Sequence, residues 1–422
     1  MKTYADAQAY LYALKSRGYA PGLDRMRRVS AVLGHPHAAI PSIHIAGTNG
    51  KGSVAAMLEA ILRAAGWRVG LYTSPHLVRL GERIQINREP LGEAAIVDYV
   101  HELRPLADAE ALTYFETMTA MAFAHFARQR CDIAVLEVGL GGRLDATNIV
   151  TPEVAVISSI GLDHADVLGD TLAAIAGEKA GIIKPDRPLV IGRLPPEAET
   201  VIRDVARERG ATVISVAGEF GDELTNYPRT NLAGDYQRWN AATATLAARA
   251  LSPRWRISDG LIDHALRVVD WSARWQRIAL DDRTLIVDSS HNAEGASVLD
   301  ANLARLVAET GRAPVVVCGV LGLDRARPII AAVCRHAREI RFVVPAQSRA
   351  SSHEQLESVV PPYYRGPVVR DTVERLFPGP GGCAAGGPGD VIVVAGSIYL
   401  AGEVLAQLEP ARGRGEGRLQ DF

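Results

Sequence analysis

Aromatic side chains, cysteines and an excess of charge of either sign are all scarce in this chain of 422 residues. Phe, Trp and Tyr make up 6% of it, so a core has to be built mostly from Ala, Val, Leu and Ile. Lys and Arg number 46 and Asp and Glu 48, and the net charge of −2 argues against binding of nucleic acid through overall charge. With 48% hydrophobic and 22% charged residues, the composition is typical of a globular protein and excludes a disordered or collagen-like chain.

The chain also lacks paired cysteines and long apolar runs. Cys131, Cys318, Cys334 and Cys383 lie far apart, without C-x-x-C or zinc-ligand spacing, so we expect free thiols in a reducing compartment. No stretch reaches the ~18 apolar residues that a membrane-spanning helix needs. The first residues lack the apolar core of a signal peptide. We therefore expect a cytoplasmic monomer that binds neither membrane nor nucleic acid.

What the chain does contain is an alternation of short β-branched runs with longer helical patterns, which favours an α/β fold with parallel sheets covered on both faces. After Lys51, apolar residues recur at helical spacing up to Ala65, and Gly66 supplies a C-terminal stop. The predicted strands are Ser42–Ala46, Arg68–Thr73, Asp132–Val138, Val154–Ser159, Pro188–Gly192, Thr284–Asp288, Pro314–Gly319, Arg341–Pro345 and Asp390–Ala395.

Small or polar residues stand where several of these strands end. Ligands bind at the carboxyl ends of strands in doubly wound sheets, so we expect a crevice there. The residues concerned are Gly47, Ser74, Glu137, Ser158, Asp288 and Gly396.

A glycine-rich loop precedes the helix that starts at Lys51. Its glycines let backbone N–H groups approach phosphate oxygens, and the helix N-terminus adds positive potential. Lys51 can bridge terminal phosphates and Ser53 can face a metal ion. Ile45 stands where the common phosphate-binding pattern has its first Gly, and Gly52 follows the lysine, so the loop is a shortened variant. It comprises Gly47, Thr48, Asn49, Gly50, Lys51, Gly52 and Ser53.

The length allows two or three domains at roughly 150 residues each. A helical segment, Ile257–Val269, is followed by a new series that begins with a strand, which indicates a boundary near Asp270–Ala273. We therefore expect a P-loop, doubly wound ATPase domain at residues 1–270 and a smaller Rossmann-like α/β domain at 274–408. Residues 409–422 alternate Arg, Gly and Glu and are predicted to be disordered.

The glycine-rich loop resembles that of the ATP-dependent Mur-type amide ligases and, within them, of the folylpolyglutamate synthase / dihydrofolate synthase family. The resemblance implies a ligase that adds L-glutamate to folates, and to dihydropteroate, through an acyl phosphate made with ATP and two Mg²⁺ ions. Further matches follow in the family's order at Thr73–Leu77, Thr113–Glu116, Leu136–Asn148, Leu162–His164, Glu178–Ile182, Asn240–Ala242 and Asp288–Asn292.

The resemblance also implies roles for single residues. Lys51, Glu137, His164 and Lys179 would be catalytic. Ser74 and Glu137 would hold the Mg²⁺ of ATP, while Glu137, His164 and a Lys179 carbamylated by CO₂ would serve a second ion. Without the family, His164 is interpreted as a loop histidine, and Glu178–Lys179 as a solvated charge pair.

Two further sets of positions match the family's ligand contacts. Nucleotide contacts outside the loop would come from Asn240, Arg274, Asp288 and His291. A flat pterin needs an apolar face and a polar edge, which Phe115 and Asp145 could supply. Without the family, Asn240 is interpreted as a surface residue, Arg274 as salt-bridged and Phe115 as a core aromatic. The full pterin set is Thr113, Tyr114, Phe115, Glu116, Leu144, Asp145 and Ala146.

Departures from the family pattern lie in the second domain. Ser290 precedes His291, Ala293 follows Asn292, Trp275 replaces a Phe, and Gly319–Arg325 replaces a run that usually ends Asp-Lys-Asp. These differences could alter glutamate binding or domain closure.

Three alternatives remain at this point. The protein could be a folylpolyglutamate synthase without dihydrofolate synthase activity. It could be a muramyl-peptide amino-acid ligase, which is disfavoured because the 46 residues before Gly47 are fewer than the ~50–250 of a compact domain. It could also be a nucleotide-binding regulator, which would not need Glu137, His164 and Lys179 together.

Overall fold

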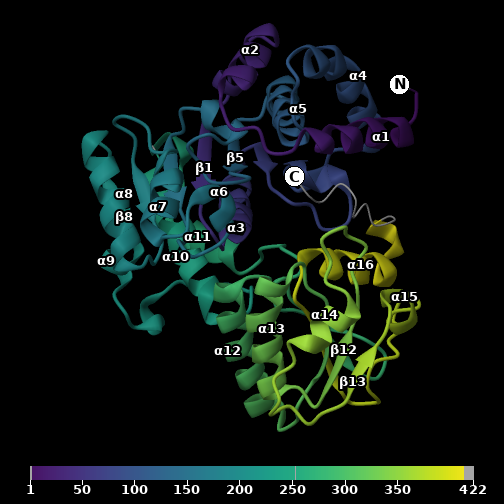
Figure 1. Cartoon of the computed structure of the whole chain (residues 1–422). Coiled ribbons are helices and arrows are strands. Elements are labelled where there is room, and N and C mark those ends of the chain that lie inside the picture. Colours follow the sequence, from purple (N-terminus) through teal and green to yellow (C-terminus); the bar gives the residue numbers. More distant parts are fainter. Residues whose placement is uncertain (1, 252, 413–422) are drawn as a thin grey trace.

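The computed structural model describes residues 2–251 and 253–412, which fold around two sheets (Figure 1). The first sheet has the strand order β4-β3-β2-β5-β1-β6-β7-β8, and the second β13-β12-β11-β14-β10-β9. Neighbours are parallel except for β2–β3, β3–β4 and β9–β10. The first sheet comprises β1 (Ser42–Ala46), β2 (Val69–Tyr72), β3 (Ile84–Ile86), β4 (Glu89–Pro90), β5 (Ile133–Glu137), β6 (Val154–Ile157), β7 (Leu189–Ile191) and β8 (Val213–Ser215); the second comprises β9 (Gln276–Ala279), β10 (Thr284–Val287), β11 (Val315–Cys318), β12 (Glu339–Phe342), β13 (Val368–Arg370) and β14 (Val391–Ala395).

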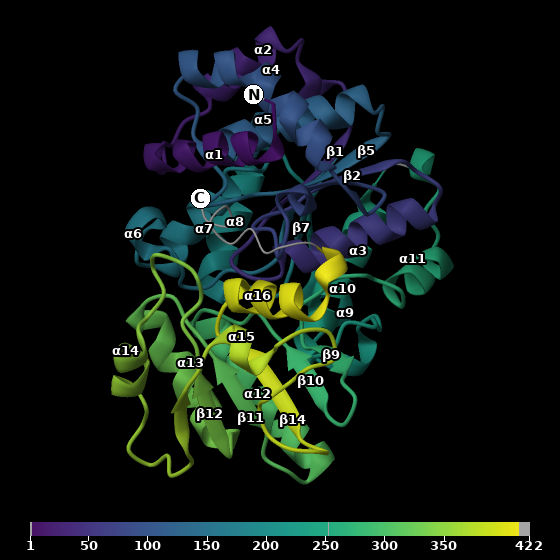
Figure 2. The ribbon, with the colours of Figure 1, turned by 90° about the vertical axis from the view of Figure 1, so that its right-hand side faces the viewer.

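Helices cover both faces of both sheets (Figure 2). They are α1 (Tyr4–Leu14), α2 (Asp24–Val32), α3 (Lys51–Ala64), α4 (Glu93–Ala109), α5 (Tyr114–Arg128), α6 (Ala165–Leu168), α7 (Leu172–Ala180), α8 (Pro196–Glu208), α9 (Val216–Phe220), α10 (Asp235–Ala250), α11 (Asp259–Leu266), α12 (Ala293–Thr310), α13 (Leu323–His336), α14 (His353–Ser358), α15 (Val373–Leu376) and α16 (Ile398–Leu408). Short 3-10 turns occur at Lys15–Arg17, Pro36–Ala38, Leu80–Arg83, Ala146–Ile149, Leu224–Asn226, Pro253–Trp255 and Pro410–Arg412.

The first sheet is doubly wound because successive residues of its strands point to opposite faces and both faces are apolar. In β1, Ile43 and Ile45 pack with α3, α10 and α11, whereas Ala46 packs with α7 and α8 on the opposite face. Helices α1, α4 and α5 complete that second face near β2 and β5. The predicted apolar stripe of α3 is buried as expected, and it fixes the helix whose first residue is Lys51.

The second sheet follows the same rule. Helices α12, α13 and α14 pack on one face and α15 and α16 on the other. The predicted fold class, a P-loop α/β domain followed by a second α/β domain, is confirmed. The second sheet starts at Gln276, close to the predicted boundary, while the exact domain limits stay a prediction. Residues 413–422 of the predicted disordered tail lie outside the described residues.

One predicted strand is displaced. Arg341–Pro345 was expected, but β12 runs from Glu339 to Phe342, paired with Val315–Cys318 of β11. Charged Glu339 and Arg341 alternate with buried Ile340 and Phe342, so half of this strand does not look like a buried one. Strands β3, β4, β8, β9 and β13 were not predicted; β4, β8, β9 and β13 each keep at least part of their length exposed to solvent.

The cysteine side chains are mostly buried. All four cysteines are free; Cys131, Cys318 and Cys334 are buried and Cys383 is half-buried. Within the part of the chain that the structure describes, no helix combines the length and apolar character needed to cross a bilayer.

Candidate active site

The glycine-rich loop is held between the ends of two neighbouring strands. The Oγ of Ser159, just after β6, accepts a hydrogen bond from the Asn49 amide at 2.9 Å, and Ser158 Oγ donates to Asn49 O at 2.7 Å. Gly50 has a φ of +81°, and a Cβ there would lie 2.4 Å from Asn240 Oδ1. Lys51 Nζ folds back onto the carbonyls of Gly47 and Thr48 at 3.0 and 3.1 Å. The loop therefore has the compact form that phosphate binding requires.

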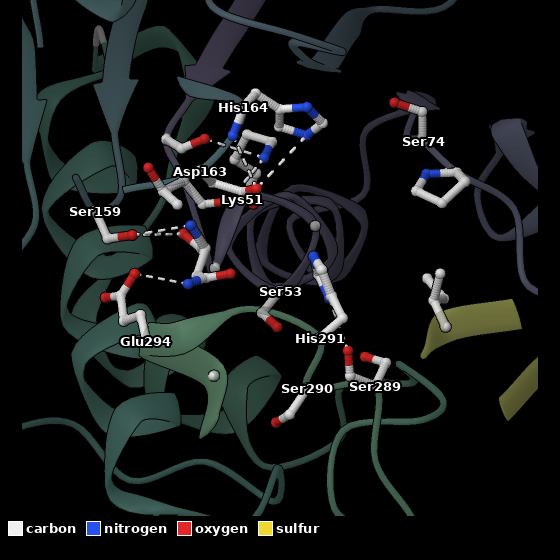
Figure 3. Close-up of a pocket in the computed structure, with 18 of the residues that line it drawn as sticks. Lys51, Ser53, Ser74, Ser159, Asp163, His164, Ser289, Ser290, His291 and Glu294 are labelled. Atoms are coloured by element: carbon white, nitrogen blue, oxygen red, sulfur yellow. Dashed lines mark hydrogen bonds and ion pairs between the residues drawn. The ribbon is translucent and has the colours of Figure 1, made fainter. Parts of the chain in front are cut away.

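A cavity of about 270 Å³ lies over this loop (Figure 3), at the carboxyl ends of strands from both sheets. Five of the six predicted strand-end residues line it, and Ser159 lines it in place of its neighbour Ser158. A second cavity of about 240 Å³ adjoins the first, and Ser74, Glu137 and Arg274 line both. The crevice expected from the strand ends is present.

Glu137 and Ser74 together form a polar site on the wall between the two cavities. Glu137 is 4% exposed, and its Oε2 accepts a hydrogen bond from the Ser74 amide at 3.0 Å. Burial raises the pKa of Glu137, although the charge of Lys51 opposes this. Ser74 Oγ is buried without a hydrogen-bond partner among the described residues. A buried carboxylate beside an unsatisfied hydroxyl fits a hard divalent cation that also binds phosphate oxygens.

Lys179 is buried beside the phosphate loop. Its Nζ donates to Gly47 O at 3.0 Å, the same carbonyl that Lys51 contacts. Burial and the charge of Lys51 lower the pKa of Lys179 to about 7. The interpretation of Glu178–Lys179 as a solvated pair is wrong, because Glu178 pairs with Arg143 at 2.7 Å and Lys179 is 5% exposed.

His164 enters the same cavity from the loop after β6. It is half-buried, has a left-handed φ of +53°, and its Nε2 lies 4.0 Å from Asp163 Oδ1. Burial lowers the pKa of His164 to about 4, so the imidazole is neutral at physiological pH and can act as a metal ligand. Glu137 and His164 are two potential ligands; no group of three or more His, Cys, Asp or Glu able to hold a metal occurs in residues 2–251 and 253–412.

The second domain supplies the opposite wall. Arg274 donates to Ala273 O at 3.0 Å and to Ser289 Oγ, and it lies between two residues in left-handed conformation, Ala273 and Trp275. Asp288 accepts the Trp275 amide at 3.0 Å, and His291 Nδ1 bonds Ser289 O at 2.9 Å. Arg274, Asp288 and His291 thus line the cavity together, and their role as nucleotide contacts stays a prediction.

Asn240 is not the surface residue that its sequence context suggests. It is 8% exposed, because it lies inside α10, which starts at Asp235 and packs against α3. Its Nδ2 donates to Gln237 Oε1 at 3.0 Å, and Gln237 Nε2 donates to Ser53 Oγ at 3.3 Å. Asn240 lines the cavity next to the phosphate loop.

Comparison with known proteins agrees with this geometry. The model of the Mur ligase middle domain matches residues 45–223. The Bacillus subtilis protein named dihydrofolate synthase/folylpolyglutamate synthase is 39% identical over 325 residues, covering 70% of this chain and 75% of that protein. This chain belongs to the dihydrofolate synthase/folylpolyglutamate synthase family.

Solved structures of family members extend the similarity to the whole chain. Escherichia coli FolC in complex with DHPP and ADP has a TM-score of 0.83 and 31% identity, covering 98% of this chain and 99% of that chain. The bifunctional folylpolyglutamate synthase/dihydrofolate synthase of Yersinia pestis, complexed with AMPPNP and Mn ion, has a TM-score of 0.80 and 32% identity, covering 96% and 98%.

The family's pterin positions lie beside the cavities, not on their walls. Phe115 is half-buried and its ring packs on the backbone of Gly139, which lines the larger cavity. Leu144 is half-buried as well, whereas Ala146 is buried. Phe115 and Leu144 therefore retain surface that a ligand could contact.

The other pterin positions already have partners within the protein. Thr113 and Glu116 cap α5 through reciprocal hydrogen bonds of 2.8 and 3.2 Å. Tyr114 is 1% exposed, with the guanidinium of Arg83 5.3 Å from its ring centre. Asp145 accepts the amides of Gly139, Leu140 and Thr147, each at 3.0 Å, and burial raises its pKa. The hydrogen bonds of Thr113 and Glu116 fix the start of the helix that carries Phe115, and those of Asp145 fix the backbone at Gly139.

Several residues that line the larger cavity were not predicted from the sequence. Tyr236 stands three residues before Trp239 and four before Asn240 on α10, a helical spacing that could have placed it on the same face as both. Ser397 is the second residue after the end of β14. Glu294 and Arg325 gave no such signal, because they reach the cavity only through the packing of the second domain.

Proposed function

We propose that this protein is an ATP-dependent ligase that adds L-glutamate to folates and to dihydropteroate. The observation that carries this proposal is the shared wall of the two cavities, where Ser74, Glu137 and Arg274 would lie between a phosphoryl donor and an acceptor carboxylate. Relatives named for both activities support it, as does the similarity to a family member that binds DHPP and ADP.

The reaction needs an activated carboxylate, since a free carboxylate does not condense with an amine in water. We assign ATP to the larger cavity. The carboxylate of the acyl substrate would lie at the wall that the two cavities share, and its pterin would lie beside the larger cavity, near Gly139. Transfer of the γ-phosphoryl group to the substrate carboxylate gives an acyl phosphate and ADP. The amine of glutamate then attacks the acyl carbon, a C–N bond forms, the amine loses a proton and inorganic phosphate leaves. Catalysis of this kind consists mainly of positioning and of charge neutralisation.

The residues of the larger cavity suit that task. Lys51 would move from the carbonyls of Gly47 and Thr48 to the terminal phosphates, while loop amides hold the phosphate oxygens. Arg274, Asp288 and His291 would hold the nucleotide from the second domain. In this division of labour, residues 1–270 would bind the phosphates of ATP, and residues 274–408 would complete the nucleotide site and bind glutamate.

The donor atoms fit two Mg²⁺ ions. Ser74 Oγ and Glu137 would hold the first, and Glu137, His164 and a carbamylated Lys179 the second. Bound there, Mg²⁺ would neutralise phosphate charge. Serine, carboxylate and carbamate oxygens are hard ligands of the kind this ion prefers, and the neutral imidazole of His164 is the softer member.

On the acyl side, Phe115 and Leu144 would contact the pterin, with Thr113, Tyr114, Glu116, Asp145 and Ala146 fixing the wall behind them. We further propose that the protein acts as a monomer in the cytoplasm, where its free thiols would stay reduced.

ADP release by the purified protein, given ATP, Mg²⁺ and L-glutamate, tests this function. Release that depends on glutamate is expected with both dihydropteroate and a reduced folate. Turnover with the reduced folate alone would restrict the enzyme to chain extension and contradict the pterin assignment. ADP release at the same rate with and without glutamate would favour a nucleotide-binding regulator. The absence of glutamate-dependent turnover with both acceptors would refute the ligase function.

A further inference from the structure

Four hydrogen-bonded contacts between the two domains meet at the edge of the larger cavity. Arg325, in the first turn of α13, donates from Nη2 to Asp163 Oδ1 at 2.7 Å. Asn292, just before α12, donates from Nδ2 to Asp163 Oδ2 at 3.0 Å and to Asn49 Oδ1 at 3.1 Å. Asn49 in turn donates to Glu294 Oε2 at 2.6 Å (Figure 3). Groups from α12 and α13 therefore hold both the phosphate loop and the loop that carries His164.

Asp163 connects the second domain to the backbone of His164. Its side chain is 11% exposed, and the Oδ1 that receives Arg325 also accepts the His164 backbone N–H at 3.0 Å. His164 has a φ of +53°, in the left-handed region that is uncommon and energetically costly for residues with a Cβ. In Figure 3, Asp163 and His164 lie side by side at the cavity, on the opposite side from His291.

We propose that Arg325 is a positioning residue whose ion pair with Asp163 holds the His164 loop in its cavity-facing conformation only while the two domains are closed. The inference rests on the proposed function, because His164 acts there in the ligation site. Separation of the domains would leave the Asp163 carboxylate without its cationic partner and free the loop to relax. Arg325 lies in the run Gly319–Arg325 that departs from the family's usual pattern.

A second ion pair between the two domains supplies a matched control. Arg305 of α12 pairs with Asp235 of α10 at 2.7 Å, with both side chains about half exposed (46% and 48%). Neither residue lines a cavity described above. Loss of this pair removes an interdomain ion pair without touching His164.

The experiment compares Arg325→Ala, Arg325→Lys, Asp163→Asn and the Asp163→Asn/Arg325→Ala double variant with Arg305→Ala in the full chain. We expect Arg325→Ala to lower kcat about 10- to 100-fold, because a misplaced catalytic group slows the reaction. The Kd of ADP should change less than about threefold, because the phosphate loop that binds ADP is kept. Arg325→Lys should recover part of the loss, and the double variant should be no worse than the worse single variant. Arg305→Ala should keep the wild-type kcat.

Amide hydrogen exchange in the ADP-bound protein supplies a readout independent of turnover. Residues 163–168 should exchange faster in Arg325→Ala than in the wild type or in Arg305→Ala. Unchanged exchange there, or losses in kcat that multiply in the double variant, would overturn the proposal. If the wild type shows no glutamate-dependent turnover, the proposed function fails, whereas the exchange comparison still decides whether Arg325 positions the loop.

Discussion

The side-chain amine of Lys179 loses its proton near neutral pH. Burial and the charge of Lys51 lower its pKa to about 7, so the neutral amine that reacts with CO₂ becomes abundant as the pH rises through 7. The same shift costs folding stability below pH 7, and this cost fades as the pH rises towards the unfolded value of 10.5. We expect a carbamate on Lys179 whose amount rises with CO₂ and with pH.

Carbon-13 NMR with labelled bicarbonate measures that carbamate. The carbonyl resonance should disappear in Lys179→Met, together with most ligase activity. Lys184→Met is the matched control, because burial and the charge of Arg209 lower the pKa of Lys184 to about 8 while this lysine lines neither cavity. A carbamate resonance that persists in Lys179→Met, or whose intensity does not change with pH, would contradict the assignment.

The negative charge of Glu137 should be required for activity but should lower the stability of the fold. Its folded-state pKa is raised by burial, so the charged form costs stability at pH values above the unfolded pKa of 4.5. Glu137→Gln keeps an oxygen for the Ser74 amide but removes the charge, and kcat should fall about 10²- to 10³-fold. Without nucleotide, its melting temperature at pH 7 should equal or exceed that of the wild type.

Glu59→Gln is the matched comparison for Glu137. Glu59 is a buried carboxylate of α3 whose pKa burial also raises, but it pairs with Arg63 at 2.8 Å and lines neither cavity. It should lose stability with the ion pair and retain activity. A Glu137→Gln variant that stays active, or unfolds earlier, would refute the cation-binding role.

At the scale of single residues, the sequence indicates which side chains belong to the site better than it indicates how deeply each is buried. Lys51 follows its glycines, so its place could be predicted from the loop alone. Lys179 stands beside Glu178 on a helix, and only the packing of α7 against the phosphate loop makes it a buried amine. Asn240 is likewise buried by tertiary packing, because α10 packs against α3 and Gln237 bonds both Asn240 and Ser53.

At the scale of the element, α3 has a left-handed glycine at each end, and the two ends should respond differently to alanine. Gly50 has φ +81° with Asn240 Oδ1 2.4 Å from an added Cβ, whereas Gly66 has φ +89° with nothing within 4 Å. Each substitution should cost about 1–2 kcal/mol of stability from backbone strain. Only Gly50→Ala should also weaken ADP binding, about tenfold or more, since Asn240 and the loop must shift.

Denaturant unfolding and calorimetric titration with ADP separate these effects. Equal loss of nucleotide affinity in both variants would show that the stability of α3, not the shape of the loop, governs binding. The comparison is sharp because backbone strain is nearly the same in the two variants.

Elements with a continuous apolar signal could be predicted with near-correct ends, and partly exposed ones could not. Strand β1 is buried throughout and was predicted as Ser42–Ala46, the bounds it has. Strands β8 and β9 have half-buried or exposed residues and lie at the edges of their sheets, where tertiary pairing rather than local sequence defines them. The displaced β12 belongs to the same class, because Glu339 and Arg341 interrupt its apolar pattern.

At the scale of the whole molecule, the sequence could place polar residues at strand ends but not the relative position of the two sheets. That position decides the site, since Arg274, Asp288 and His291 reach the cavity only because the second domain faces the phosphate loop. The backbone on either side of Arg274 contributes to this, with Ala273 at φ +57° and Trp275 at φ +53°. No local pattern predicts such a pair of left-handed residues.

Because the cavity has walls from both domains, nucleotide should stabilise both. The two sheets have separate hydrophobic cores, so scanning calorimetry of the full chain without ligand should show two transitions or one broad one. ADP with Mg²⁺ at about 100 times its Kd adds about 2.7 kcal/mol to the free energy of unfolding of each domain whose unfolding releases the ligand. We expect the transitions to rise and merge, and Lys51→Ala to abolish this shift. If the transition of the second domain stays in place, the nucleotide is held by residues 1–270 alone, and the assigned contacts of Arg274, Asp288 and His291 are wrong.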